Sequence, residues 1–118
     1  LELIVYAPAT VSFDMAVKAE DTDDSIQYSD PGHMPGDATD TTASVTWTGS
    51  SSWAADEVVQ SPDIKTVIQE VIDRSGWSSG NDLTVRLHYG GSTATESYVF
   101  KTYDDSSSVA AKLTIKYS

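Results

Sequence analysis

Aspartates gather in one stretch of the chain, and their oxygen atoms are the ligands that calcium prefers. The stretch 20–42 is rich in aspartate and carries Pro and Gly at turn positions, which predicts a long acidic loop. Ca²⁺ takes several such oxygens at about 2.4 Å. The candidate ligands are Asp21, Asp23, Asp24 and Asp30. Their spacing lacks the EF-hand pattern, so a solvated acidic loop is the favoured interpretation and calcium the only candidate cofactor.

Aromatic side chains outside the strand patterns indicate a second kind of chemistry. Trp53 and Trp77 fall in predicted loops, where indole rings could stack on the apolar faces of sugars. A loop Asp or Asn, with Asn81 as the candidate, would hold the sugar hydroxyls, although Ser79-Gly80-Asn81 also has the composition of a turn. Core packing is the competing interpretation, and we favour it for Trp77 because that residue follows a helix-ending glycine. Trp47 alternates with Val45 and is predicted to be core.

Catalytic motifs are not recognisable in the sequence. His33 and His88 lie far apart and have no partner at metal-ligand spacing. A nucleophile elbow, a phosphate-binding glycine loop and a paired-histidine motif are all missing from the sequence. The carboxylates lie mostly in predicted loops, which hold a glycosidase pair poorly. We therefore predict that the protein is not an enzyme.

One amphipathic helix is predicted among strand-like segments. Ser61 suits the N-cap, Pro62 the first helical position and Gly76 the left-handed stop. The apolar stripe follows the period of about 3.6 residues and comprises Ile64, Val67, Ile68, Val71 and Ile72. We expect a helix of about three turns that lies on a sheet. Arg74, at its C-terminal end, should bind exposed carbonyls or an acidic neighbour such as Asp104.

The sequence of this helix and its exit, SPDIKTVIQEVIDRSGWSSGN at residues 61–81, also carries a family resemblance. It resembles a signature of non-catalytic, jelly-roll-like β-sandwich modules in secreted bacterial polysaccharide-acting proteins, adhesins and phage structural proteins. Residues 42–47 and 111–117 look similar to the flanks of that signature. Ser75 and Asp105 depart from it, where Pro and Gly are usual. The resemblance implies an extracellular, cell-surface or virion location.

Composition sets the outer limits of function. The 118 residues suffice for one domain, residues 1–118, and contain no cysteine, so neither disulfides nor thiolate metal sites are expected. The formal net charge of −11 disfavours binding to nucleic acid and to anionic lipid. No apolar run approaches the roughly 18 residues of a membrane span, so membrane insertion is not expected.

Alternating apolar and polar residues predict the strands. The predicted strands are 1–7, 11–20, a short one at 25–28, 43–48, 83–89, 98–103 and 112–117. A Gly90–Gly91 turn should follow the strand 83–89. Short strands at this spacing predict a mainly β fold, an antiparallel two-sheet sandwich with one short amphipathic helix. The family resemblance implies that the sandwich is of jelly-roll type.

The first residues of the chain bear on its function. Leu1 lies inside a strand pattern and no initiator Met precedes it, so we interpret the chain as a fragment or processed piece of a larger protein. A sandwich without its opening strands would expose an edge that another chain could complete. We therefore expect a non-catalytic structural or assembly module of a filament, surface layer or virion, in contact with protein subunits as a homo-oligomer or with neighbouring domains. The alternative is a carbohydrate-binding accessory module whose partner is a polysaccharide.

Overall fold

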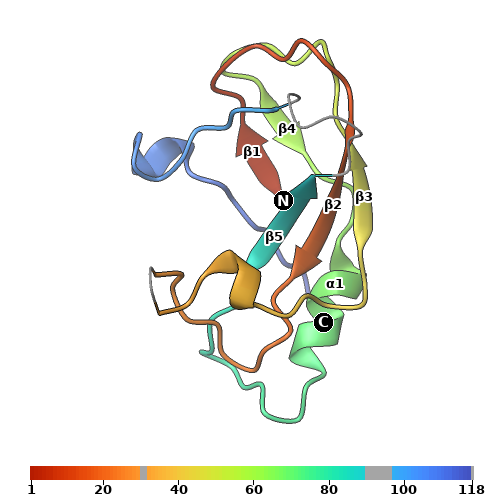
Figure 1. The fold of residues 1–118 in the computed structure, drawn as a ribbon, viewed down its shortest axis with the longest axis vertical. Coiled ribbons are helices and arrows are strands. Elements are labelled where there is room, and N and C mark those ends of the chain that lie inside the picture. Colours follow the sequence, from red (N-terminus) through yellow and green to blue (C-terminus); the bar gives the residue numbers. More distant parts are fainter. Residues whose placement is uncertain (30–31, 90–96, 118) are drawn as a thin grey trace. The chain divides into compact units, whose positions relative to one another are not determined.

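A computed structural model describes residues 1–29, 32–89 and 97–117 of the chain (Figure 1). These residues form five β-strands, one α-helix and two short 3₁₀-helices, at Pro35–Asp37 and Ser107–Val109. The chain divides into two compact units. The first comprises Leu1–Met15, Trp47–Pro62 and Gly90–Ser118, and the second Ala16–Thr46 and Asp63–Tyr89.

A two-stranded antiparallel sheet organises the first unit. Strand β1 (Glu2–Ile4) pairs with β4 (Val58–Gln60), and Leu3 stands opposite Val59 (Figure 1). Leu3 and Val59 are both buried. Because side chains alternate across a strand, this pair marks the face of the sheet that belongs to the core.

The second sheet contains three strands in the order β3-β2-β5. Strand β2 (Asp14–Ala19) buries alternate residues, Met15, Val17 and Ala19, as the period of two requires. Its neighbours are β3 (Val45–Thr48) and β5 (Val85–Tyr89). Strands β2 and β3 each contribute residues to both units.

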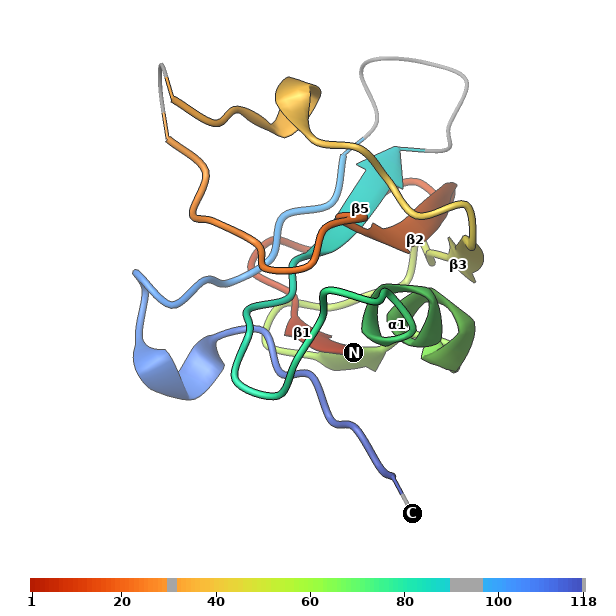
Figure 2. The same ribbon diagram turned by 90° about the horizontal axis from the view of Figure 1, so that it is seen from below.

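Helix α1 (Lys65–Ile72) packs on this second sheet within the second unit (Figure 2). Its Val67 and Val71 form a buried cluster with Ala19 of β2. The partly buried residues packed against this cluster are Ala43, Val45, Trp77 and Leu83. The predicted apolar stripe is therefore confirmed at its centre.

The predicted helix boundaries are wrong at both ends. At the C-terminus the cap residue is Asp73, and Gly76 does not have the left-handed φ expected of it. The N-cap position is Ile64 and no side chain caps it, while the Ser61 hydroxyl donates a hydrogen bond to the carbonyl of Pro62. The carboxylate of Asp63 instead accepts a hydrogen bond from the amide of Lys65 at 2.9 Å. The helix has 8 residues, shorter than expected, and Ile72 at its end is 36% exposed.

The predicted strands also differ in extent from the observed ones. Segment 98–103 forms only an isolated bridge, between Phe100 and Val5 just after β1, and segment 112–117 forms only an isolated bridge, between Lys112 and Glu2 of β1. Segment 25–28 forms no strand, and Ser29 bridges His33 instead. The Gly90–Gly91 turn lies outside the described residues.

The fold class predicted from the sequence is confirmed. The described chain is mainly β, with two antiparallel sheets of the sandwich type and one short amphipathic helix. None of its described helices has the length and apolar character needed to cross a membrane.

Candidate functional site

Strand β1 is hydrogen-bonded along both of its edges. On one side β1 pairs with β4, and just beyond it Val5 donates to the carbonyl of Glu57 at 2.9 Å and accepts from the amide of Asp56 at 2.8 Å. On the other side the backbones of Glu2 and Lys112 exchange two hydrogen bonds, at 2.8 and 3.0 Å. The first strand of the chain is therefore an interior strand, and its own edges offer nothing to a partner.

Strand β4 is the exposed neighbour of β1. Among the described strands it pairs with β1 alone. Val59 turns into the core, whereas Val58 is 55% exposed and Gln60 is also exposed. Just before the strand, Asp56 has the left-handed φ of 66°, which interrupts the extended backbone. The outer side of β4 is thus a short sheet edge whose exposed residues, Val58 and Gln60, carry no charge.

A strand-like segment at residues 113–117 lies entirely exposed in the first unit. Leu113, Ile115 and Tyr117 alternate with polar residues and are 37, 53 and 95% exposed. After Lys112, the described residues of this segment make no hydrogen bond. The segment combines a half-buried strand pattern with a backbone that lacks protein partners.

Three of the calcium candidates are engaged in the second unit by polar groups of the protein. The guanidinium of Arg74 binds Asp21 at 2.6 Å and Asp23 at 2.7 Å. The hydrogen bonds that Arg74 donates to the carboxylates of Asp23 and Asp21 raise the pKa of Arg74 above its ordinary value. The predicted partners, carbonyls or Asp104, are therefore replaced by two carboxylates more than 50 residues earlier in the sequence. Asp24 accepts a hydrogen bond from the amide of Asp82 at 2.7 Å.

The geometry around this ion-paired cluster is tight. A Cβ atom at Gly76 would overlap the carboxylate of Asp23, so glycine leaves the space that the carboxylate fills. Asn81 closes the cluster by donating from its amide to the carbonyl of Asp23 at 2.9 Å. In the part of the chain that is described, no three His, Cys, Asp or Glu side chains form a group able to hold a metal ion. Asp30 lies outside the described residues.

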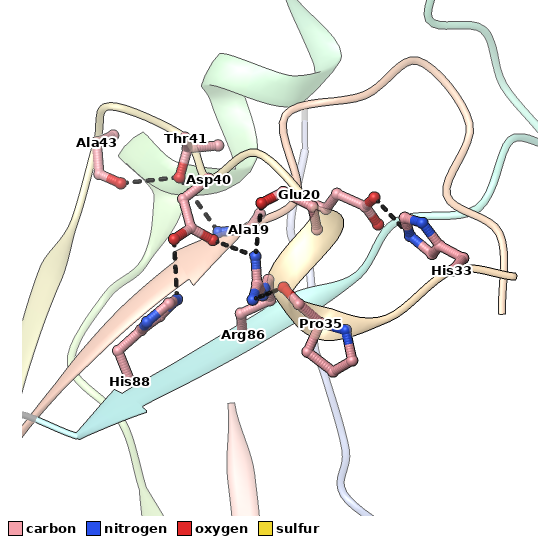
Figure 3. Close-up of polar contacts among 10 residues, drawn as sticks. Ala19, Glu20, His33, Pro35, Asp40, Thr41, Ala43, Arg86 and His88 are labelled. Carbon is pink, nitrogen blue, oxygen red and sulfur yellow. Dashed lines mark hydrogen bonds and ion pairs between the residues drawn. The ribbon is translucent and has the colours of Figure 1, made fainter. Parts of the chain in front are cut away.

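A second polar network, centred on Arg86 of β5, could not be expected from sequence spacing (Figure 3). Arg86 binds Asp40 at 2.7 Å and donates to the carbonyl of Pro35 at 2.6 Å. The other oxygen of Asp40 lies 3.1 Å from Nε2 of His88. The network fastens the segment that contains Pro35 and Asp40 to β5, which is a bracing role.

The second histidine also meets a carboxylate. Nε2 of His33 lies 2.9 Å from Oε1 of Glu20, within ion-pair distance but not aligned for a hydrogen bond (Figure 3). The Glu20 side chain is 6% exposed, and its Oε2 has no hydrogen-bond partner. Neither histidine is free, because each faces an acid that is distant in sequence. Sequence spacing did not reveal these acidic partners of the histidines, because tertiary folding brings them together.

Tyr28 lies beside this network. The ring centroid of Tyr28 is 5.0 Å from that of His33. The guanidinium carbon of Arg86 lies 6.0 Å from the ring centroid of Tyr28. Burial raises the pKa of Tyr28 above its ordinary value, and the charge of Arg86 partly opposes this effect. The Tyr28 hydroxyl is buried without a hydrogen-bond partner.

The glycan candidates are engaged within their own units. Trp77 packs against the core cluster of Val67 and Val71, and its indole nitrogen is buried. Both ends of the Asn81 amide are used, since its oxygen lies 3.3 Å from the Ser78 hydroxyl. These two residues belong to the second unit and Trp53 to the first.

Trp53 belongs to an aromatic cluster in the first unit. Its ring centroid lies 4.9 Å from that of Tyr98 and 6.0 Å from that of Trp47. Tyr98 stacks on Phe13 at 4.1 Å, and its hydroxyl donates to the carbonyl of Val11 at 3.1 Å. Trp47 is buried, as its alternation with Val45 predicts. Trp53 is therefore half-covered by other rings.

Comparison of the chain with protein-family models, curated proteins and solved structures gives no significant match. The resemblance of residues 61–81 to a module signature stays a prediction.

Proposed function

We propose that this protein is a non-catalytic structural module that assembles with other protein subunits by β-strand complementation. The observation that carries the proposal is the exposed, alternating segment 113–117 in a unit that also exposes the edge of β4. Unpaired backbone groups on strand-like segments are templates for pairing with another chain. Strand addition satisfies those groups and buries apolar side chains at the same time.

The setting that we propose is extracellular, at a cell surface or in a virion. This part rests on the resemblance of residues 61–81 to modules of secreted and phage structural proteins. The net charge of −11 supports a protein partner over nucleic acid, since phosphates would be repelled. A filament or surface layer built from repeated subunits is the kind of assembly that strand exchange produces.

The carbohydrate-binding alternative has less support. Stacking on sugars needs an exposed aromatic face, but Trp77 packs against the core cluster and Trp53 is half-covered by Trp47 and Tyr98. The amide of Asn81 is already engaged by Asp23 and Ser78. Because no other observation favours sugar binding, we retain it only as an outcome of the test.

The test is the solution mass of the chain across a wide range of concentration, measured by sedimentation velocity. The proposal predicts reversible association, with the circular dichroism of a folded β protein at every concentration.

In parallel, tryptophan fluorescence is titrated with a panel of acidic and neutral oligosaccharides. A monomer at all concentrations whose fluorescence shifts with a sugar, with the shift lost in Trp53→Ala, would replace assembly by glycan binding. A monomer that binds no sugar would leave a passive spacer.

A further inference from the structure

We infer that the segment 113–117 of one copy adds as a strand to the outer edge of β4 in a second copy. The inference rests on the proposed function and names its donor and its acceptor. The donor is the exposed segment that begins with Leu113, and the acceptor is the edge of Val58–Gln60. Both belong to the first unit.

The two surfaces match in pattern. In β4, Val59 turns to the buried face while Val58 and Gln60 turn to the exposed face. In the donor, Leu113 and Ile115 share one face, and Thr114 lies on the other. A donor placed with Leu113 and Ile115 beside Val59 extends the buried face and leaves Thr114 on the same exposed side as Val58.

Geometry within the first unit indicates a second copy as the occupant. Lys112 is bonded to one edge of β1, and β4 is bonded to the other. A donor beyond β4 would stand three strand spacings from Lys112, about 14 Å at roughly 4.8 Å each. Five extended residues span only about 17 Å, so reaching that edge would use almost the whole segment. The segment therefore cannot pair with β4 of its own chain.

Charge also favours a second copy. The donor region carries Lys112 and Lys116 and no acidic residue in 110–118, although the chain as a whole has a net charge of −11. Around the acceptor strand stand the carboxylates of Glu2, Asp56 and Glu57. Of these, Asp56 forms an ion pair with Lys101. The excess of negative charge at the acceptor suits Lys116 of an incoming donor.

The contact is heterologous, because donor and acceptor are different surfaces on opposite sides of β1. Repeating it builds an open chain of subunits, or a closed assembly where the rotation between copies allows closure. The expected assemblies therefore contain two or more copies, each copy contributing one donor and one acceptor.

The experiment uses cysteine cross-linking, which is clean because the chain has no cysteine of its own. Three single variants are made at exposed positions: Thr114→Cys in the donor, Val58→Cys in β4, and Thr46→Cys in β3 as the control edge. Pairs are mixed in a glutathione redox buffer. Because each chain carries a single cysteine, any protein–protein disulfide joins two copies, and the mixed disulfides with glutathione are separated from it by mass.

The inference predicts that Thr114→Cys couples to Val58→Cys at least about tenfold faster than to Thr46→Cys, since pairing raises the effective concentration of the two thiols. Equal coupling to both edges, dominant Thr114→Cys homodimers, or no coupling would overturn it. If the unmodified chain still associates in such a case, only this inference fails. If the unmodified chain stays monomeric, the proposed function fails with it.

A second variant tests the same contact without cross-linking. Ile115→Asp places a charge on the donor face beside Val59, whereas Thr114→Asp places it on the opposite face. Both residues are exposed, so both variants should fold. Ile115→Asp is expected to weaken association by at least about tenfold relative to Thr114→Asp. Equal effects of the two changes would contradict the assigned faces.

Discussion

The backbones of Glu2 and Lys112 exchange two hydrogen bonds, at 2.8 and 3.0 Å, and thereby occupy one edge of the strand that begins the chain. Because Val59 and its neighbours occupy the other edge, β1 is an interior strand. Among the described residues of this unit, β4 and the residues that follow Lys112 still offer unpaired edges to a partner. The sequence predicted an unpaired edge beside the first strand, but both edges of that strand are paired.

Gly76→Ala should weaken the ion-paired cluster at the end of helix α1. The new Cβ would overlap the carboxylate of Asp23 and push it from Arg74, so the melting temperature should fall by a few degrees. Gly36→Ala is the control, because nothing lies within 4 Å of a Cβ at that position. The coupling is measured by adding Arg74→Ala. Strictly additive losses in the double variant would show that Gly76 does not act through the ion pair.

Ile68→Ala should lower the free energy of unfolding by about 2 to 5 kcal/mol, because Ile68 is 7% exposed and its removal leaves a cavity. The matched control on the same helix is Ile72→Ala, which should lose less than about 1 kcal/mol since Ile72 is exposed. Equilibrium denaturation in urea measures both. Equal losses would mean that the helix does not bury the assigned face.

Calcium should leave the stability of the chain unchanged. Arg74 already neutralises Asp21 and Asp23, and a cation would have to displace it. The melting temperature is compared in millimolar Ca²⁺ and in chelator. A site filled at one hundred times its dissociation constant would add about 2.7 kcal/mol, so a clear rise in melting temperature would restore the metal hypothesis.

Tyr28→Phe should be neutral or slightly stabilising at pH 7, because it removes a buried hydroxyl that has no hydrogen-bond partner.

The same variant should also change how the free energy of unfolding depends on pH under alkaline conditions. Burial raises the pKa of Tyr28 above 10.0, so the folded state keeps the phenol proton to higher pH than the unfolded state does. That contribution is complete below pH 10 and is lost as the pH rises through the folded pKa. The variant should therefore lose stability less steeply above pH 10, as measured by denaturation across pH 8 to 11. An identical slope would contradict the raised pKa.

The periodicity of apolar residues along the chain predicted the helices and strands in which that periodicity is strong. The stripe of Val67, Ile68 and Val71 predicted a helix on a core, and the alternation in β2 predicted a half-buried strand. Strand β4 was not predicted, because Val58 and Val59 are too short a run to show a period. The N-cap at Ser61 was wrong because its hydroxyl bonds to Pro62 and receives the N-terminus of Leu1, a contact made only in the folded chain.

The contacts within the candidate sites were likewise not predicted, because they join residues that are distant in the sequence. Sequence reasoning singled out Asp21 and Asp23 for their charge, but their partner Arg74 follows them by more than 50 positions. The pairs Arg86 with Asp40 and His33 with Glu20 also join distant segments. Spacing along the chain carries no signal for such contacts, whereas it does show the alternation of Leu113, Ile115 and Tyr117.

The most direct test of assembly through strand pairing is hydrogen exchange measured by mass spectrometry at low and high protein concentration. In dilute solution the amides of residues 113–117 should exchange rapidly, because they have no partner within the chain. In concentrated solution, peptides covering residues 113–117 and β4 should become protected together, while the β3 edge at Thr46 stays unchanged. Association without protection of these two segments, or equal exchange at every concentration, would contradict the account.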